Sequence, residues 1–396
     1  MREHAAPLED VIIVNTCAVT GEAERQARQA IRRAHRDKPG ARIVVTGCAA
    51  QIDPDRWAAL PGVVRVLGNE EKLKAESWSA SAMQEARAVS DIMAAKETAA
   101  HLVTEFAGRT RAFVQVQQGC DHRCTFCIIP FGRGPSRSAP VGVVVEQVKA
   151  LVDAGYREVV LTGVDMTSWG GDLPGKPLLG QLCRRVLALV PQLERLRLSS
   201  VDPVEIDEDI WRLLAEEPRF MPYLHLSLQA GSDLILKRMK RRHLAEDAAR
   251  VIARARSLRP GIGIGADVIA GFPTEDDALF EETRAFLAEQ SIPYLHVFPY
   301  SERPGTPAAR MRAVNVPERK ARAACLRDVG AEAAKVYFEG FVGQNVRVLM
   351  ETPQSGHSEQ FAPVRLKAEE ADAQAGEIID MRVIEASATG LLAERI

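Results

Sequence analysis

Short apolar runs alternate with longer charged segments over the first seventy residues of the chain. Runs of four to eight apolar residues that end at polar breaks are typical of buried parallel strands. The charged segment Gly21–Lys38 predicts a helix, and a second, short helix is expected near Asp53–Leu60. This alternation predicts an N-terminal doubly wound α/β domain over residues 1–76. Its strands are expected at Val11–Asn15, Arg42–Thr46 and Val63–Leu67.

A longer series of strand and helix patterns covers residues 107–338. Six apolar or alternating runs are separated by helical patterns, which indicates parallel strands joined by crossover helices. They predict an open, partial (β/α)6 barrel, in which functional residues lie in the loops after the strands. The expected strands are Arg111–Gln117, Glu158–Thr162, Arg195–Ser199, Tyr223–Leu228, Ile262–Ala270 and Tyr294–Phe298.

Two further regions have different patterns. Residues 77–106 are rich in Ala, Ser and Glu without a clear period, and are expected to be a linker that contains a short helix. Residues 339–396 hold short strand patterns divided by polar turns, which predicts a small C-terminal β-barrel.

Composition narrows the class of protein. The net charge of −2 gives no overall signal for nucleic-acid binding, so any RNA contact must come from local patches. The sequence has no apolar run of about 18 residues and no apolar core of a signal peptide near its start. Seven cysteines, an odd number with clustered spacing, suit a reducing compartment. We therefore expect a cytoplasmic protein without a membrane partner.

The candidate chemistry is concentrated in three cysteines, Cys120, Cys124 and Cys127, which form a C-x3-C-x2-C triplet. Thiolates are soft ligands that select zinc, copper(I) or iron–sulfur clusters. A structural zinc site usually closes with four ligands, and no fourth Cys or His follows at a suitable spacing. Three thiolates on a four-iron cluster leave one iron open for substrate. The triplet therefore favours a redox cluster over structural zinc or unliganded thiols.

The triplet also carries a family resemblance. With VQVQQG before it and IIPFGRGPSRS after it, it resembles radical S-adenosylmethionine (SAM) enzymes, and more narrowly their methylthiotransferase branch. The resemblance implies that Cys120, Cys124 and Cys127 hold a 4Fe–4S cluster whose open iron binds SAM. One electron, from a donor such as a flavodoxin or ferredoxin, would then split SAM to a 5′-deoxyadenosyl radical.

Cys17 and Cys48 end the first two predicted strands, on the edge where doubly wound sheets bind ligands. By pattern alone, each could equally be a small buried residue. The segments VNTCAVTGEAERQARQ and VVTGCAAQ resemble the methylthiotransferase N-terminal domain, in which three cysteines hold a second cluster. Cys17 and Cys48 match the second and third ligands. Because no cysteine precedes Cys17, we expect either a start placed too late or an incomplete domain that lacks the full second site. The resemblance also implies a sulfur source and Fe–S assembly proteins as partners.

Residues at the ends of the predicted barrel strands are candidate SAM contacts by the same resemblance. Gly163 and Asp165 match the segment that meets the SAM amino group, and the segment around Asp267 resembles the motif that lines the adenosine. For the polar residues, the alternative is a helix cap or turn former. The full set is Phe126, Gly163, Asp165, Ser200, Gln229, Asp267 and Phe298.

Basic residues supply the candidate RNA contacts. The run KRMKRRH is either a solvated helix end or a patch that neutralises phosphates. The arginines beside the cysteine triplet could be ion-pair partners or contacts to SAM or tRNA. The set is Arg133, Arg137, Lys237, Arg238, Lys240, Arg241 and Arg242.

The C-terminal region resembles the TRAM domain, an RNA-binding module, in its position and in the segment GHSEQFAPVRL. Residues 341–396 carry five Lys or Arg and nine Asp or Glu, which argues against strong nonspecific phosphate binding.

The most specific parts of the resemblance are the segments RLRLSSVDPVEID, LHLSLQAGSDLILKRMKRRH, GADVIAGFPTE and HVFPYSERPGTPAARM. They are most similar to the branch that converts N6-threonylcarbamoyladenosine, at position 37 beside the tRNA anticodon, to its 2-methylthio form. The anticodon loop of tRNA is then the expected partner. The isopentenyladenosine tRNA branch and the ribosomal-protein aspartate branch are alternatives. A tRNA-binding or Fe–S carrier protein without methylthiotransferase activity is an alternative of another class.

Overall fold

The computed structural model describes residues 1, 5, 8–79, 81–95, 110–368 and 372–396. The chain divides into two compact units, each built from segments that are far apart in the sequence. The first contains residues 1–99, 118–137 and 301–311. The second contains residues 100–117, 138–300 and 312–396. The two units are described separately below.

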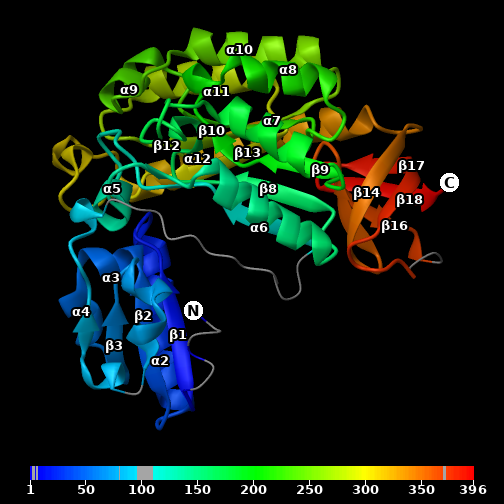
Figure 1. The fold of residues 1–396 in the computed structure, drawn as a ribbon. Coiled ribbons are helices and arrows are strands. Elements are labelled where there is room, and N and C mark those ends of the chain that lie inside the picture. The colour runs from blue at the N-terminus through cyan, green and yellow to red at the C-terminus, as the bar shows by residue number, and fades with distance from the viewer. Residues whose placement is uncertain (2–4, 6–7, 80, 96–109, 369–371) are drawn as a thin grey trace. The chain divides into compact units, whose positions relative to one another are not determined.

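A four-stranded parallel sheet in the order β1-β2-β3-β4 forms the centre of the first unit (Figure 1). Its first three strands are the predicted ones, and β4 comes from the segment predicted to be a linker. Helices connect them, and α3 was not predicted because it is a single short turn of helix. The bounds are β1 Val11–Thr16, α2 Gly21–Asp37, β2 Arg42–Gly47, α3 Cys48–Ile52, α4 Pro54–Ala58, β3 Val63–Leu67 and β4 Arg87–Ala88.

Local sequence explains why α2 starts where it does. The Thr20 side chain accepts a hydrogen bond from the backbone N–H of Ala23, which caps the helix. Acidic residues in the first turn and basic residues in the last turn complement the helix dipole. On its inner face Ile31 is fully buried against Ile43 and Val45 of β2 and Trp57 of α4.

Short elements complete the first unit. Three 3₁₀ turns lie between β3 and β4, a fourth follows β4, and the cysteine loop leads into α5. The segment 301–311 packs in the same unit: Gly21 N donates to Ser301 Oγ (2.9 Å), and Arg303 forms a buried ion pair with Glu24. Part of the predicted linker, residues 96–106, lies outside the described residues. The bounds are η1 Glu71–Leu73, η2 Ala75–Trp78, η3 Ala82–Gln84, η4 Ile92–Ala94, α5 Ile129–Arg133 and η7 Pro307–Arg310.

The second unit contains the predicted barrel of six parallel strands. Strands β5, β8 and β9 form one sheet, and β10, β11, β12 and β13 form the next. The third predicted strand is divided at Ser199, because β9 pairs with β8 whereas β10 pairs with β11. The strands are β5 Arg111–Gln115, β8 Glu158–Thr162, β9 Arg195–Leu198, β10 Ser200–Val201, β11 Tyr223–Gln229, β12 Gly263–Ala270 and β13 Tyr294–Pro299.

Helices cover the outside of this curved sheet (Figure 1). Their apolar faces and the strands form one core that includes Leu151, Leu182, Leu214 and Ile252. The two-stranded ribbon β6–β7 brackets the cysteine loop. The bounds are β6 Gln117–Gln118, β7 Arg137–Ser138, α6 Val141–Asp153, η5 Met166–Ser168, α7 Leu179–Leu189, η6 Pro203–Glu205, α8 Glu208–Glu216, α9 Asp233–Arg238, α10 Ala245–Leu258 and α11 Asp277–Gln290.

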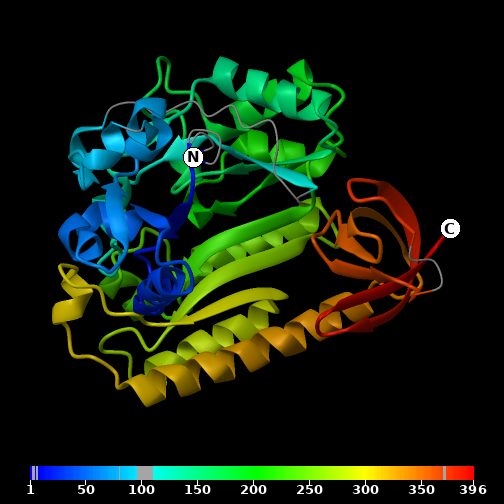
Figure 2. The same cartoon turned by 90° about the horizontal axis from the view of Figure 1, so that it is seen from below.

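The long helix α12, Val316–Glu339, runs beside β13 and leads into a small closed barrel at the C-terminus (Figure 2). The barrel has the order β14-β15-β16-β18-β17 and its own apolar core. Strand β15 was not predicted because its sequence, SGHS, is short and polar. The bounds are β14 Asn345–Thr352, β15 Ser355–Ser358, β16 Pro363–Leu366, β17 Ile378–Ser387 and β18 Gly390–Arg395. No helix among the described residues is long and apolar enough to cross a bilayer.

Candidate active site

The cysteine loop is closed at its base by two glycines in the left-handed region of backbone conformation. Gly119 has φ of 76° and Gly134 has φ of 75°. A Cβ on Gly119 would lie 1.8 Å from the carbonyl oxygen of Pro135, so a side chain is excluded there. Cys120 N donates to Gly134 O at 3.1 Å. The ends of the loop are therefore held together by backbone contacts that only glycine permits.

Hydrogen bonds within the first unit fix the rest of the loop. Cys127 N donates to Cys124 O at 3.1 Å, and Ala308 N of η7 donates to Thr125 O at 2.9 Å. The guanidinium of Arg123 donates to the carbonyl of Cys120. The thiols of Cys120, Cys124 and Cys127 are partly exposed, and none is in a disulfide. Three accessible thiols on a fixed loop fit the donor set of a cluster with one open iron.

Cys17 and Cys48 each directly follow a strand of the N-terminal sheet, and the two strands are neighbours that end in register. Thr16 of β1 is paired with Gly47 of β2, and each cysteine is the next residue. Neighbouring strands lie about 4.8 Å apart, so both cysteines follow the same edge of the sheet. Val19 N donates to Cys17 Sγ at 3.4 Å. This position fits two ligands of one cluster.

Cys48 is contacted by the helix that follows the cysteine triplet. Arg133 Nε, at the end of α5, donates to Cys48 Sγ at 2.9 Å. Asn69 Nδ2 lies 3.8 Å from the same sulfur and donates to Gly132 O at 2.6 Å. A Cβ on Gly132 would lie 3.0 Å from the Cys48 Cβ, so the helix approaches closely. The structure thus joins the surroundings of Cys48 to the cysteine loop within one unit.

Lys72 adds a second positive charge to these surroundings. Its Nζ donates to Asn69 Oδ1 at 2.7 Å, and the residue is only 7% exposed. Burial, together with the charge of Arg133, lowers the pKa of Lys72 to about 8. Among the described residues, no carboxylate pairs with Lys72 or Arg133. Positive groups and N–H donors around a sulfur stabilise a thiolate or an anionic cluster.

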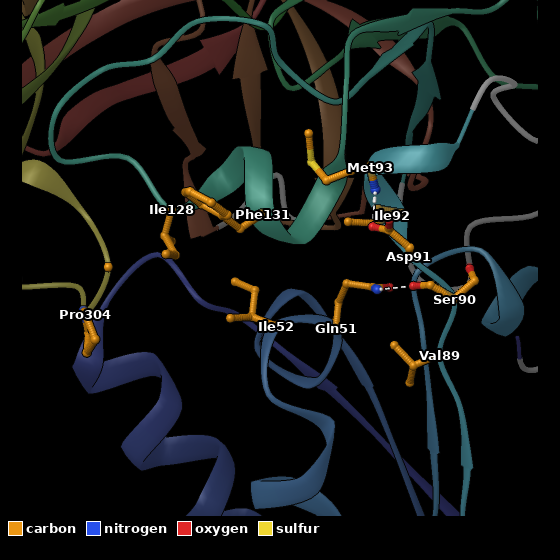
Figure 3. Close-up of a pocket in the computed structure, with 11 residues that line it drawn as sticks. Gln51, Ile52, Val89, Ser90, Asp91, Ile92, Met93, Ile128, Phe131 and Pro304 are labelled. Carbon is orange, nitrogen blue, oxygen red and sulfur yellow. Dashed lines mark hydrogen bonds between the residues drawn. The ribbon is translucent and has the colours of Figure 1, made fainter.

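A mostly apolar pocket of about 520 Å³ opens between the segments that carry these cysteines (Figure 3). Gln51 and Ile52 belong to the helix that begins at Cys48, and Ile128 directly follows Cys127. Phe131 of α5 lines the pocket with 53% of its surface exposed. The volume is within the range of small-ligand sites. The remaining lining residues are Val89, Ser90, Asp91, Ile92, Met93, Pro304 and Gly305.

In the second unit, the predicted SAM residues Gly163 and Asp165 follow β8. The Gln117 side-chain oxygen accepts hydrogen bonds from Val164 N (2.9 Å) and Asp165 N (2.8 Å). A Cβ on Gly163 would lie 3.0 Å from that of Gln117. Ser168 Oγ donates to Asp165 Oδ2 at 2.7 Å. The turn after β8 is therefore fixed by Gln117, which the sequence did not identify.

Other predicted SAM residues lie on the next strands of the barrel. Ser200 begins β10, Gln229 ends β11 and Phe298 is near the end of β13, with 46% exposure. Gln229 has φ of 73°, an uncommon conformation for a residue with a side chain, at an irregularity of the strand. Asp267 differs, because it lies inside β12 and contacts His225 and His296.

Two family descriptions match the chain. The radical SAM superfamily matches residues 114–287, and the uncharacterized protein family UPF0004 matches residues 3–68. A threonylcarbamoyladenosine tRNA methylthiotransferase MtaB from Rickettsia prowazekii is 52% identical over 91% of this chain and 85% of its own length. The MtaB of Aquifex aeolicus is 38% identical over 87% of this chain and 84% of its own length. The chain belongs to the radical SAM methylthiotransferases.

Solved structures support the fold of this methylthiotransferase. The radical SAM methyltransferase TsrM from Kitasatospora setae has a TM-score of 0.57 at 16% identity, over 78% of this chain and 66% of that chain. The same enzyme with cobalamin and a [4Fe-4S] cluster bound has a TM-score of 0.56, over 76% of this chain and 65% of that chain. The radical SAM fold and the family resemblance that the sequence predicted are therefore confirmed, and the family uses a 4Fe–4S cluster and SAM.

The basic run of the methylthiotransferase is partly occupied by internal contacts. Arg241 donates to Asp202 Oδ2 at 2.9 Å, Arg242 pairs with Glu205 at 2.7 Å, and Arg238 donates to Thr274 O at 3.0 Å. Lys237 and Lys240 are exposed. Only part of the run therefore presents its charge to solvent, which the dense sequence pattern did not indicate.

The two arginines beside the cysteines also have internal partners. Arg137 is only 4% exposed and donates to Pro135 O at 3.1 Å. Arg133 contacts Cys48 and, at 3.1 Å, Gln118 Oε1. Their roles in RNA binding stay predictions. Asn69 and Lys72 were missed because nothing in a single sequence marks an Asn or Lys that meets a cysteine through folding.

Proposed function

We propose that this chain methylthiolates C2 of N6-threonylcarbamoyladenosine at position 37 of tRNA, next to the anticodon. The 52% identity to a threonylcarbamoyladenosine tRNA methylthiotransferase supports this substrate. The observation that carries the proposal is the 2.9 Å contact from Arg133 to Cys48. This contact connects the cysteine loop of the radical SAM site with Cys48 at the edge of the N-terminal sheet. Methylthiolation requires both cysteine sites to act on the same substrate.

Each cysteine set has its own role in this proposal. Cys120, Cys124 and Cys127 hold the radical SAM cluster, and Cys17 and Cys48 are two ligands of a second cluster that delivers sulfur. With SAM bound, the first cluster supplies one-electron cleavage chemistry. Cys17 and Cys48 are the two cysteines among residues 1–119.

Arg133, Lys72 and Asn69 act at the sulfur of Cys48 in this proposal. The N–H groups of Arg133 and Asn69 orient the Cys48 side chain, and the positive charges of Arg133 and Lys72 offset the negative charge of thiolate-bound iron and sulfide. Groups of this kind, hydrogen-bonded to cluster sulfurs, tune the affinity and potential of a cluster. We therefore assign Arg133 to the second cluster instead of to RNA.

The strand-end residues of the barrel hold SAM in the proposal. The turn that Gln117 fixes after Gly163 presents the Asp165 carboxylate, which suits the positively charged amino group of SAM. Gln229 of β11 and Phe298 of β13 lie at the same edge of the sheet, because they are paired with the consecutive residues Val268 and Ile269 of the strand between them. Ser200 and, from the cysteine loop, Phe126 complete the proposed set.

RNA contacts come from exposed groups. Lys237 and Lys240 offer charge to phosphates, and the C-terminal barrel acts as a TRAM-like module that reads RNA shape. The exposed ring of Phe131 offers a stacking face for an unstacked base of the anticodon loop. The protein then works in the cytoplasm with tRNA, an electron donor, a sulfur source and Fe–S assembly proteins.

A second candidate substrate is isopentenyladenosine in tRNA. A tRNA-2-methylthio-N(6)-dimethylallyladenosine synthase from Maricaulis maris is 36% identical over 87% of this chain, which is a lower similarity. Nucleoside analysis separates the two. Digested tRNA from a deletion strain should lack 2-methylthio-threonylcarbamoyladenosine and keep the isopentenyl product. Restoration by the wild-type gene, and none by a gene with all three triplet cysteines changed to alanine, would support the proposal.

Iron content tests the second cluster. Anaerobically reconstituted protein with two four-iron clusters should contain about eight irons per chain. About four irons would limit the chain to the radical SAM cluster, and would favour a tRNA-binding or carrier role. Persistence of 2-methylthio-threonylcarbamoyladenosine in the deletion strain would refute the proposed substrate, even if the protein contains eight irons.

A further inference from the structure

Two histidines and an aspartate meet on the inner side of the barrel strands. His225 lies on β11, Asp267 on β12 and His296 on β13, which are neighbouring parallel strands. His225 pairs in register with Gly265, two residues before Asp267, and Asp267 pairs with His296. Their ligand-type atoms all lie within 4.8 Å of one another. The position is therefore fixed by the sheet and does not depend on a loop.

The distances fit the ligand shell of a metal ion. His225 Nε2 is 3.2 Å from Asp267 Oδ1, and His296 Nδ1 is 3.4 Å from the same oxygen. Two ligands that are each about 2.1 Å from an ion lie about 3.0 Å apart at a right angle and about 3.4 Å apart in a tetrahedron. The two observed separations have this size. The imidazole rings of the two histidines are tilted by 40° to each other, with centroids 4.9 Å apart.

A neighbouring side chain fixes the orientation of His225. Tyr223 Oη lies 2.9 Å from His225 Nδ1, which leaves Nε2 directed at the cluster. Histidines that bind metals commonly have such a partner on the far ring nitrogen. The Arg197 guanidinium lies 5.8 Å from the centre of the Tyr223 ring and is itself neutralised by Glu158 at 2.7 Å. The tyrosine is therefore held in place without an extra charge beside the cluster.

Exposure changes across the cluster. The side chain of His225 is 8% exposed, that of Asp267 is 28% exposed and that of His296 is 58% exposed. Hydrogen bonds from both imidazoles outweigh burial, which alone would raise the pKa of Asp267, and hold that pKa below its usual range. The cluster thus offers one carboxylate and two imidazoles, and it is open on the His296 side.

We propose that His225, Asp267 and His296 form a binding site for one divalent transition-metal ion, such as Mn²⁺ or Fe²⁺. Two histidines and one carboxylate with open positions are the ligand set of non-haem iron sites. The open side leaves room for water or for an oxygen ligand from a bound molecule. Asp267 is then a metal ligand, in place of the SAM contact that the sequence predicted.

The competing explanation is a hydrogen-bonded trio in which Asp267 accepts from both rings and no ion is present. Mn²⁺ separates the two explanations, because it prefers oxygen and nitrogen ligands to the thiolates of the cysteine sites. The probe is MnCl₂ added to anaerobic, cluster-loaded full-length protein without SAM or tRNA. The six-line electron paramagnetic resonance signal of free Mn²⁺ measures binding. The result does not depend on the proposed substrate.

We expect the wild type to bind one Mn²⁺ per chain, and His296→Gln to bind it at least tenfold more weakly. His296 is mostly exposed, so this variant should keep its iron content and its unfolding temperature in metal-free buffer. Asp267→Asn, which has the same shape, should weaken binding further. Zn²⁺ should compete for the same site.

The matched control is His357→Gln. His357 Nδ1 lies 3.2 Å from the Glu351 carboxylate, the same distance as in the cluster, but the described residues supply no third ligand there. This variant should bind Mn²⁺ like the wild type. The proposal is overturned if the wild type binds no Mn²⁺, if His296→Gln binds it equally well, or if His357→Gln loses binding to the same extent.

Discussion

Positively charged side chains have different partners in the two units of this methylthiotransferase. In the barrel unit, the buried Glu158 carboxylate receives Arg197 at 2.7 Å and Arg195 at 3.6 Å. In the first unit, Arg133 donates to the sulfur of Cys48 and Lys72 donates to Asn69, which also contacts that sulfur; among the described residues neither cation has a carboxylate partner. Buried charge is costly unless it is paired. The buried arginines of the barrel therefore have a countercharge within the protein, whereas the positive groups near Cys48 suit a bound anion.

This difference distinguishes residues that maintain the fold from residues that serve a bound group. Removing a charge from the barrel should reduce stability and leave iron content unchanged. Removing a charge near Cys48 should reduce iron content and leave stability nearly unchanged. Four variants, in order of decreasing expected effect, test whether the two regions differ in this way.

The largest effect is expected from changing Cys120, Cys124 and Cys127 together to alanine. Methylthiolation should be abolished, and reconstituted protein should lose about four irons per chain. Cys183→Ala is the control, because that thiol is fully buried in α7 and burial raises its pKa, which disfavours the thiolate that a cluster ligand needs. Iron loss in the Cys183 variant would contradict the assignment.

Glu158→Gln should be strongly destabilising, because it leaves Arg195 and Arg197 buried without a countercharge. Breaking a buried pair costs about 3 kcal/mol or more in free energy of unfolding. Denaturant unfolding measures this loss, and iron per folded chain should stay constant. Glu194→Gln is the control, because its partners are exposed and such pairs contribute less than about 1 kcal/mol.

The same pair gives a pH dependence. Burial alone would raise the pKa of Glu158, but Arg197 and Arg195 outweigh it and hold that pKa below its usual range. The stabilisation is therefore complete above the unfolded-state pKa of about 4.3 and is lost as the pH falls through the lower folded value. The stability difference between wild type and Glu158→Gln should shrink on acidification. A constant difference would contradict the pairing.

Arg133→Gln should reduce methylthiolation by about tenfold to a hundredfold, the usual effect of removing a group that orients a metal ligand. Iron should fall below the wild-type content, and Arg133→Lys should restore part of it by returning the charge. Arg123→Gln is the control, because Arg123 lies in the same loop and donates to backbone carbonyls. If Arg123→Gln and Arg133→Gln reduce methylthiolation and iron content equally, the substitutions act on the conformation of the loop and not on Cys48.

The smallest effect is expected for Phe131→Ala. Loss of one stacking face should weaken tRNA binding by about tenfold, or about 1.4 kcal/mol, without a change in iron content. Leu189→Ala, another exposed apolar side chain, is the control. Filter binding or fluorescence anisotropy with an anticodon stem-loop measures the affinity. Unchanged affinity would mean that the pocket in Figure 3 is not part of the RNA-binding surface.

The sequence predicted what depends on local pattern. The apolar runs became β1, β2 and β3, and all six barrel strands are present. The elements that were missed, such as α3 and β15, have five or fewer residues, too few for a period to be recognised. The break between β9 and β10 was missed for another reason, since it depends on which strands become neighbours.

The same limit applies to the candidate site. The spacing of the cysteine triplet was visible because its members are close in sequence. Arg133 and Cys48 are 85 positions apart, so their contact exists only after folding. Asp267 was predicted as a SAM contact from its motif, and its two histidine neighbours come from other strands. Sequence pattern identifies reactive residues, but tertiary structure determines what they face.

Residues 301–311 have a consequence for biosynthesis. Ala308 N in this segment donates to Thr125 O in the cysteine loop, and Arg303 pairs with Glu24. The segment nevertheless follows β13, the last strand of the (β/α)6 barrel, in the sequence. A ribosome that adds roughly 5–20 residues per second needs on the order of ten seconds to reach this segment after making the loop. The cysteine loop therefore lacks the contact from Ala308 until most of the chain has been translated. Iron delivery is best timed after translation of residue 311, and earlier delivery would meet a loop that lacks one of its supports.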